Sequence, residues 1–323
     1  MLAPLCGITD SVFRKICIDH GSDMVVTEMI SSEGLVRNSR QIRAIQHLNM
    51  ADGPLSLQIF GSDPGAMGEA AAILSVLKPR FIDINFGCPV RKIVTKNGGS
   101  ALLKDIDLLH RICERVVQNS LVPVSAKIRS GWDKASAGRL KELGRAIEDA
   151  GVSMIAVHAR TKRQGFKGKA DWSLVGMVKD AVSIPVVGNG DVTGPDAYVK
   201  LLQESGCDAV MIGRSAIGNP WIFEEIKAAT HGQEYQRPTP HERARVLLQH
   251  VRLAVELCGE PTGVVLMRKM MGAYLKRLPR ARELRGKLVK CSRLVELQSL
   301  VDDYLRGTCV ETVADQTSLE SVC

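Results

Sequence analysis

The sequence contains no Cys-x-x-Cys pair, although nine cysteines are spread over its 323 residues. An odd, scattered set argues against a disulfide framework, and the paired spacing of a zinc site is missing too. No apolar run approaches the roughly 18 residues that cross a membrane, and no basic segment followed by an apolar run opens the chain. We therefore expect a cytoplasmic protein with reduced thiols, no metal and no membrane partner.

Acidic residues are almost missing from one stretch, positions 268–293. It holds ten lysines and arginines and one acid, Glu283, so its net charge is +9, whereas the whole chain carries +8. By subtraction (8 − 9) the rest of the chain carries about −1, so this stretch holds the entire basic excess. Such asymmetry favours a polyanionic partner, with a solvated helical face as the plainer alternative.

Short apolar runs recur along the first two thirds of the chain, and most are followed by segments with helical spacing. Strand and helix in alternation predict a parallel sheet, and eight repeats in roughly 220 residues favour a closed (β/α)8 TIM barrel, an α/β fold. The first run begins at residue 2, so we expect the first strand to be the weakest and leave open whether Met1 is the true start. The eight runs are Leu2–Leu5, Met24–Glu28, Leu55–Phe60, Phe81–Phe86, Val124–Ile128, Met154–His158, Pro185–Asn189 and Asp208–Ile212.

Beyond Trp221 the strand signals stop, and from His241 the apolar residues follow helical spacing. We therefore predict a small C-terminal α-helical bundle of three or four helices. The predicted domains are residues 1–238 for the barrel and 239–310 for the bundle, and residues 311–323 are predicted to form a loose tail.

Polar residues cluster where the predicted strands end, which is where active sites of such barrels lie. Cys88 follows the fourth strand, between Gly87 and Pro89, and a buried structural thiol is the alternative interpretation. Asp83 shares a strand face with Asn85 deeper in the barrel, and we expect it to make a structural hydrogen bond. The strand-end candidates are Gln58, Asn85, Cys88, Lys127, Arg129, His158 and Arg160.

The last two predicted strands end in backbone rich in glycine. Asn189, Gly190 and Asp191 follow the seventh strand, and Gly213 and Arg214 follow the eighth. In TIM barrels these two loops form the usual phosphate site, and an arginine adds a fixed pair of donors. We infer a phosphorylated cofactor that spans the barrel mouth, with its reactive ring near Gln58, Lys127 and Cys88.

Seven motifs in one order resemble the tRNA-dihydrouridine synthases, most closely the bacterial B-type, and the resemblance runs from the barrel into the helical region. Leu5-Cys6 stands where that family commonly has Met-Ala after the first proline, which matters little if the contact is made by backbone. The motifs are Ala3–Asp10, Leu57–Gly61, Asn85–Pro89, Gly98–Leu102, Lys127–Gly131, His158–Thr161 and Asn189–Asp191.

The resemblance implies a barrel that binds FMN, a helical domain that binds tRNA, and reduction of D-loop uridines with NADPH, or NADH, as electron donor. It implies that Cys88 donates a proton to C5 of uracil, that flavin N5 gives a hydride to C6, and that Asn85 and Arg129 hold the base. The implied cofactor contacts are Pro4, Leu5, Cys6, Gln58, Lys127, His158, Asn189, Gly190, Asp191, Gly213 and Arg214. We expect the RNA contacts to be made by Arg160 and by residues of the basic stretch, namely Arg268, Lys269, Lys276, Arg277, Arg280, Arg282 and Arg285.

Two other functions compete with this interpretation. A flavin barrel that reduces a free pyrimidine would have no need of a polycationic surface. An inactive RNA-binding module would have no need of Cys88, Lys127 and His158, and would purify without colour. The charge asymmetry and the intact polar set therefore favour an enzyme that acts on tRNA, and we expect it to be a monomer.

Overall fold

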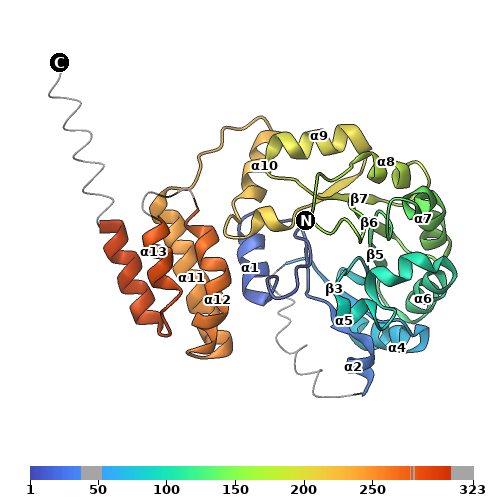
Figure 1. Ribbon diagram of the computed structural model, residues 1–323, viewed down its shortest axis with the longest axis horizontal. Coiled ribbons are helices and arrows are strands. Elements are labelled where there is room, and N and C mark those ends of the chain that lie inside the picture. The colour runs from blue at the N-terminus through green and yellow to red at the C-terminus, as the bar shows by residue number, and fades with distance from the viewer. Residues whose placement is uncertain (38–52, 277, 279–280, 307–323) are drawn as a thin grey trace. The chain divides into compact units, whose positions relative to one another are not determined.

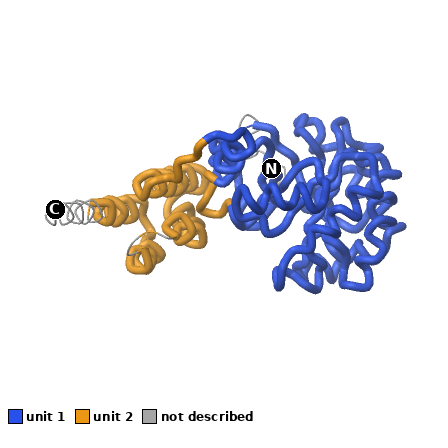
Figure 2. The backbone as a smooth tube through the Cα atoms, turned by 90° about the horizontal axis from the view of Figure 1, so that it is seen from above, with its two compact units in different colours: residues 1–215, 222–233 blue, residues 216–221, 234–323 orange. Residues whose placement is uncertain are grey.

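The computed structural model describes residues 1–37, 53–276, 278 and 281–306 (Figure 1). Two compact units are coloured separately in Figure 2: Met1–Ser215 with Ile222–Gln233, and Ala216–Trp221 with the described residues from Glu234 onward. Arg277, Arg280 and the predicted tail at 311–323 lie outside the described residues.

The first unit is the predicted barrel of parallel strands. Its strands follow the order β1-β3-β4-β5-β6-β7-β8, and Leu2 forms parallel bridges to both Val25 and Ile212, which joins the two ends of the sheet. The first predicted strand thus contributes a single bridging residue, and β2 pairs with β3 as an addition that the sequence did not indicate. The strands are β1 (Val25–Val26), β2 (Ile30–Ser31), β3 (Leu55–Phe60), β4 (Phe81–Phe86), β5 (Val124–Arg129), β6 (Met154–His158), β7 (Val186–Asn189) and β8 (Ala209–Met211).

Helices surround the strands of the first unit (Figure 1). Three of them begin at an aspartate, Asp10, Asp63 or Asp105, whose side chain accepts a hydrogen bond from a backbone N–H of the first turn. These caps fix where each helix departs from the loop after the preceding strand. The elements are α1 (Ser11–Asp19), α2 (Ser32–Arg37), α4 (Pro64–Ser75), α5 (Arg91–Val94), η2 (Gly99–Lys104), α6 (Ile106–Asn119), η3 (Ser136–Arg139), α7 (Leu140–Asp149), α8 (Ser173–Lys179), α9 (Pro195–Ser205), η4 (Arg214–Ala216) and α10 (Ile222–Thr230).

Small side chains pack one part of the core of the first unit. Ala3, Val26, Ala156, Val187 and Met211 form a buried apolar cluster contributed by the first predicted strand, β1, β6, β7 and β8. Polar residues of β3, β4 and β5 are buried as well, and four of them lie in the carboxyl-terminal halves of those strands: Gln58, Asn85, Lys127 and Arg129. The strands thus carry both an apolar core and a polar site.

The second unit is helical, as the apolar spacing predicts. Thr239 begins α11 with a capping box, in which its hydroxyl accepts from the Glu242 N–H and the Glu242 carboxylate accepts from the Thr239 N–H. Within the apolar stretch at 284–305 the chain leaves the helix after Leu288 and resumes at residue 294, so the described part of the unit has four helices, within the predicted three or four. The elements are α11 (Pro240–Cys258), α12 (Thr262–Tyr274), α13 (Ala281–Leu288) and a helix described over 294–306.

Hydrogen bonds explain the break in that last stretch. The Arg268 guanidinium donates to the Cys291 carbonyl (2.8 Å), and the Glu260 carboxylate accepts from the Leu294 N–H (2.5 Å). Both ends of the interruption therefore have partners on other parts of the unit, which periodicity cannot reveal. Over the ranges that the structure describes, every helix is too short or too polar to span a bilayer.

Candidate active site

Strand register brings the predicted polar residues into rows at the carboxyl end of the barrel. Asn85 on β4 lies opposite Lys127 on β5, and Arg129 on β5 lies opposite His158 on β6. His158 in turn lies opposite Asn189 at the end of β7. All five side chains are buried, so their charges and dipoles act in a medium that screens them less than water does.

A chain of side-chain hydrogen bonds joins β3, β4 and β5 below this row. Asn85 Nδ2 donates to Gln58 Oε1 (2.8 Å), and Gln58 Nε2 donates to Asp83 Oδ2 (2.7 Å). Ser125 Oγ donates to the other oxygen of Asp83 at 2.6 Å. The hydrogen bonds expected of Asp83 are therefore present, and burial raises the pKa of its carboxyl to about 6.

The turn that carries Cys88 is held from both sides. Asn85 Oδ1 accepts from the backbone N–H groups of Gly87 (3.1 Å) and Cys88 (2.9 Å), while Ser100 donates its own N–H and its hydroxyl to the Cys88 carbonyl. Gly99 has a φ of +56°, and a Cβ there would lie 2.8 Å from the Cys88 oxygen. Cys88 is half-buried, and burial raises the pKa of its thiol, so the group keeps its proton near neutrality.

Lys127 provides a buried cation on β5, the strand that pairs with β4. Its Nζ donates to Asn189 Oδ1 at 3.2 Å, and Asn189 Nδ2 is anchored on the Met211 carbonyl at 2.7 Å. Burial, followed by repulsion from Arg129, lowers the pKa of Lys127 to about 8. The ammonium is therefore mostly charged near pH 7.

His158 is the uncharged member of the row. Burial lowers its pKa to about 2, helped by Lys127 and nearby guanidinium groups, so the imidazole stays neutral. Gly190 has a φ of +126°, and a Cβ there would lie 3.2 Å from His158 Cδ2 and 3.0 Å from Ala170. Only glycine therefore fits at this point of the predicted phosphate loop.

The Arg129 guanidinium donates its hydrogen bonds to backbone carbonyls. Its Nε donates to Gly87 (2.9 Å), and its Nη1 donates to Thr161 (3.2 Å) and Gly165 (2.9 Å). It therefore ties the loop before Cys88 to the loop after β6. The guanidinium carbon also lies 5.5 Å from the centre of the Phe166 ring, within range of a cation–π contact.

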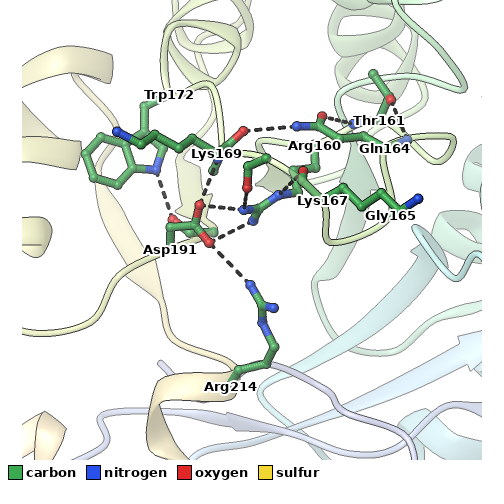
Figure 3. A network of polar contacts seen from close by, with 12 residues as sticks. Arg160, Thr161, Gln164, Gly165, Lys167, Lys169, Trp172, Asp191 and Arg214 are labelled. Carbon is green, nitrogen blue, oxygen red and sulfur yellow. Dashed lines mark hydrogen bonds and ion pairs between the residues drawn. The ribbon is translucent and has the colours of Figure 1, made fainter.

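Arg160, predicted to contact RNA, is 2% exposed and forms the centre of the network in Figure 3. It binds both carboxylate oxygens of Asp191, at 2.8 and 2.6 Å, and donates to the Gly168 and Lys167 carbonyls. Its donors hold the 160–172 loop rather than face outward. Burial opposes ionisation of Asp191, yet bonds from Arg160 and the Ala170 N–H keep its pKa below the usual range.

Arg214 shares Asp191 but is held far less firmly. One nitrogen lies 3.2 Å from Asp191 Oδ1, and the side chain is 51% exposed (Figure 3). Its guanidinium carbon lies 4.6 Å from the centre of the Phe166 ring. Arg214 can thus turn to an incoming anion, whereas the buried Arg160 cannot without giving up its paired contact with Asp191 and its bonds to two backbone carbonyls.

Phe166 is the main residue that sequence reasoning missed. It is 53% exposed, and its ring lies near Arg129, Arg214 and His158, whose ring centre is 6.1 Å away. The signal available was an aromatic residue among Lys162, Arg163 and Lys167, a pattern typical of nucleic-acid contacts. Gly99 and Ser100, which fix Cys88, lie in a motif whose role the sequence did not define.

The segment Pro4 to Cys6, at the end of the first predicted strand, lies beside the end of β8. A Cβ on Gly213 would lie 3.7 Å from Ala3 and 3.8 Å from Leu5, so this backbone passes close to the predicted phosphate loop. Cys6 is exposed, and the hydroxyl of Thr9 accepts from the Leu5 N–H at 2.9 Å. Among the residues that the structure describes, His, Cys, Asp and Glu side chains form no cluster that would hold a metal ion.

The predicted RNA contacts of the second unit divide into two kinds. Arg268 is half-buried and uses its guanidinium on the Cys291 carbonyl and the Ser292 hydroxyl. The others that can be described are exposed on α12, just after it and on α13: Lys269, Lys276, Arg282 and Arg285.

Comparison with known proteins identifies relatives along the whole barrel and the bundle. The family described as Dihydrouridine synthase (Dus) matches residues 1–308. The chain is 41% identical to a tRNA-dihydrouridine synthase B of Pseudomonas aeruginosa over 287 residues, which cover 88% of this chain and 86% of the relative. It is 39% identical to the protein of that name from Vibrio vulnificus over 287 residues, 88% of each chain.

Among solved structures, the histamine dehydrogenase from Rhizobium sp. 4-9 is similar with a TM-score of 0.55 at 13% sequence identity. The match covers 72% of this chain and 45% of that protein, so the chain spans less than half of that relative's length. At this identity the likeness concerns the fold, and it agrees with a TIM barrel.

Proposed function

This chain belongs to the dihydrouridine synthase family, and on that premise we propose that it reduces uridine in the tRNA D-loop to dihydrouridine, with FMN as cofactor and NADPH as electron donor. The observation that carries the proposal is the half-buried, protonated thiol of Cys88, held on a fixed turn after β4, with the buried cation of Lys127 on the neighbouring strand β5. A reduction that adds one hydride and one proton needs an acid of this kind.

The residues present fit a flavin phosphate. A phosphate needs backbone close by and a cation free to turn, and these are offered by Gly190, Gly213 and the half-exposed Arg214. A polar ring needs fixed donors, and Gln58 and Lys127 provide an amide and an ammonium. Bound FMN, once reduced by NADPH, would supply the hydride for C6 of the uracil ring.

Cys88 would give its proton to C5 of the uracil ring. Its pKa lies above the usual range because the thiol is half-buried, so the proton is present at neutral pH and is lost only when a basic carbon develops beside it. Lys127 would stabilise negative charge near the cofactor, and neutral His158 would add a dipole without adding a second charge.

Asn85 and Arg129 would govern how the base enters. Asn85 uses one N–H and its oxygen within the protein, which leaves the second N–H of the amide for a uracil carbonyl. Arg129 would act by its charge and by holding the two loops, because its bonds go to backbone carbonyls. Phe166, exposed beside Arg129, offers a face on which a base can stack.

The experiment that tests the function compares the wild type with Cys88→Ala and with Cys258→Ala, a matched change at an exposed cysteine of the second unit. Unmodified tRNA and NADPH are supplied, and dihydrouridine is measured by mass spectrometry. We expect all three proteins to be yellow and to be reduced by NADPH, and only Cys88→Ala to lose product, by about 100-fold or more.

Three results would contradict the proposal. Unchanged product from Cys88→Ala would remove the thiol from the reaction. A wild-type protein that purifies without flavin and leaves tRNA unreduced would remove the activity itself. Reduction of free uridine at a rate equal to that of tRNA would point instead to a free pyrimidine as substrate.

A further inference from the structure

The hydrogen bonds beneath Cys88 all run in one direction. The Cys88 N–H donates to Asn85 Oδ1, Asn85 Nδ2 donates to Gln58 Oε1, and Gln58 Nε2 donates to Asp83 Oδ2. The chain of donors therefore ends on the carboxylate of Asp83. Its links measure 2.9, 2.8 and 2.7 Å, within the normal range for N–H···O bonds.

An ionised carboxylate can only accept hydrogen bonds, whereas a primary amide can turn over and exchange its donor and acceptor ends. If Gln58 turned over, its oxygen would face the oxygen of Asp83, and its NH2 group would face the NH2 group of Asn85. If Asn85 then turned over as well, its NH2 group would face the N–H groups of Gly87 and Cys88. Each reversed arrangement opposes like groups, so the acceptor-only end of the chain decides the orientation of both amides.

We propose that Asp83 is a positioning residue, which fixes the amide orientation of Gln58 and Asn85 and through Asn85 the turn that carries Cys88. Asp83, Gln58 and Asn85 are 3%, 1% and 8% exposed, so water has little access to replace a lost bond. The inference rests on the proposed function only for the identity of the ligand, because the chain of bonds is a property of the protein itself.

The fixed orientation has a consequence for the ligand. With each amide oxygen and one N–H used internally, the remaining hydrogen of each amide nitrogen is a donor. The residues therefore select a ring that presents carbonyl acceptors, as uracil and flavin do, over one that presents amino groups. Asp83 thereby acts on specificity from a position that touches neither ring.

Charges next to Asp83 keep the carboxylate ionised near neutral pH. Burial raises its pKa to about 6, and bonds from Ser125 and Gln58 and the charge of Lys127 oppose that rise. Near pH 7 the carboxylate is therefore mostly ionised and accepts only, while Lys127, with a pKa of about 8, stays mostly charged. An experiment near pH 7 thus examines this chain of hydrogen bonds with Asp83 ionised and Lys127 charged.

The test compares Asp83→Asn with Ser125→Ala. Asp83→Asn keeps the shape of residue 83 but lets it donate, which removes the preference for one orientation. Ser125→Ala deletes the other bond to the same carboxylate and leaves the chain toward Cys88 unchanged. The first readout needs neither cofactor nor tRNA: alkylation of Cys88 by iodoacetamide, resolved by mass spectrometry and normalised to exposed Cys258.

We expect Asp83→Asn to change the Cys88 alkylation rate at least about threefold and to lower transfer from reduced protein to tRNA about tenfold. The thermal midpoint should stay close to wild type, and Ser125→Ala should resemble wild type in both the alkylation rate and the rate of transfer to tRNA. Wild-type rates for Asp83→Asn, or equal losses in both variants together with a lower midpoint, would overturn the positioning role. If wild type made no dihydrouridine, the proposed function would fail, and the alkylation rates would still decide the role of Asp83.

Discussion

The barrel mouth and the basic surface of the helical unit both use lysine and arginine, yet they use them in opposite ways. Lys127, Arg129 and Arg160 are buried, and each has protein partners at hydrogen-bond distance. Lys269 and Arg282 are exposed on helices. A buried cation acts through fixed geometry and a weakly screened field, whereas an exposed cation acts through counterion release and tolerates movement. Substitution of a buried lysine or arginine is therefore expected to have a large local effect on the barrel, whereas substitution of an exposed one in the helical unit is expected to have a small, additive effect on binding.

The largest expected effect comes from Arg160→Ala. It leaves the Asp191 carboxylate, which is 29% exposed, without its bidentate partner. Breaking a fully buried pair lowers the free energy of unfolding by about 3–5 kcal/mol, so for this partly exposed pair we expect a loss of about 3 kcal/mol. Urea denaturation measures the change. Arg160→Lys should recover little, because an ammonium cannot make the paired contact or reach the Gly168 carbonyl at the same time.

A matched control for Arg160 is Arg139→Ala, which removes an exposed pair with Glu142 on the outside of the barrel. Its unfolding free energy should differ little from that of wild type, because exposed pairs contribute little. If Arg160→Ala were no more destabilising than Arg139→Ala, the contrast between buried and exposed cations would be wrong for this protein.

The next prediction concerns the dependence of stability on pH. Here we expect the larger effect in the helical unit, because that unit contains a buried histidine whose pKa is lowered. His250 is fully buried against Tyr274, with Nδ1 2.9 Å from the Tyr274 hydroxyl, and burial lowers its pKa from 6.5 to about 3. The unfolded chain therefore binds a proton first, and the contribution of His250 is complete above pH 6.5 and falls by about 1.4 kcal/mol per pH unit below it.

The barrel should respond less to acid between about pH 6 and pH 4. His158 has the same sign as His250, but Asp83, whose pKa rises from 3.8 to about 6, has the opposite sign and stabilises the folded state as it takes up its proton. Hydrogen exchange at pH 7 and pH 5, corrected for intrinsic rates, should show α11 losing protection before β4. His250→Gln should reduce that difference, and equal losses in both units would contradict the assignment.

A smaller effect is expected to distinguish Arg268 from its neighbour Lys269 in the helical unit, because Arg268 is half-buried and Lys269 is exposed. Arg268 donates to the Cys291 carbonyl at the break before the helix at 294–306, so Arg268→Ala should lower the stability of this unit by about 1–3 kcal/mol. Its influence on the salt dependence of RNA binding should be slight. The thermal midpoint and a salt titration together test this, and a changed salt slope without a change of stability would assign Arg268 to the RNA surface instead.

The sequence predicted the barrel well because apolar runs recur regularly along the chain and side chains alternate between two faces within each run. All eight apolar runs contain a strand or the bridging residue Leu2, and alternation within strands placed Asn85, Lys127 and His158 at one end of the sheet. The expected number of helices in the second unit, three or four, left open where the last of them is interrupted, because the bonds at Cys291 and Leu294 that accompany the break come from residues distant in sequence.

The sequence predicted which polar residues gather at the carboxyl end of the barrel, but it did not predict the contacts that they make. Arg129 and Arg160 bind backbone carbonyls of Gly87, Gly165 and Gly168. Every residue has a backbone carbonyl, so the sequence does not reveal which of them accepts a hydrogen bond from an arginine. The sequence therefore assigned both arginines to the substrate. The direction of the chain from Cys88 to Asp83 was equally hidden, because it depends on which amide end faces which partner.

The smallest expected effect is that of Lys269→Gln, which tests the exposed side of the contrast at the position next to Arg268. An exposed lysine that contacts a phosphate should, when neutralised, weaken tRNA binding a few fold at low salt and reduce the slope of log K against log salt by about 1. The thermal midpoint should stay at the wild-type value, because the side chain is exposed on α12. Lys276→Gln and Arg282→Gln should add further steps of the same size, since counterion release is additive. Wild-type binding that stayed flat between low and moderate salt would show that the basic helical surface does not bind phosphate, and would leave the barrel as the RNA-binding unit.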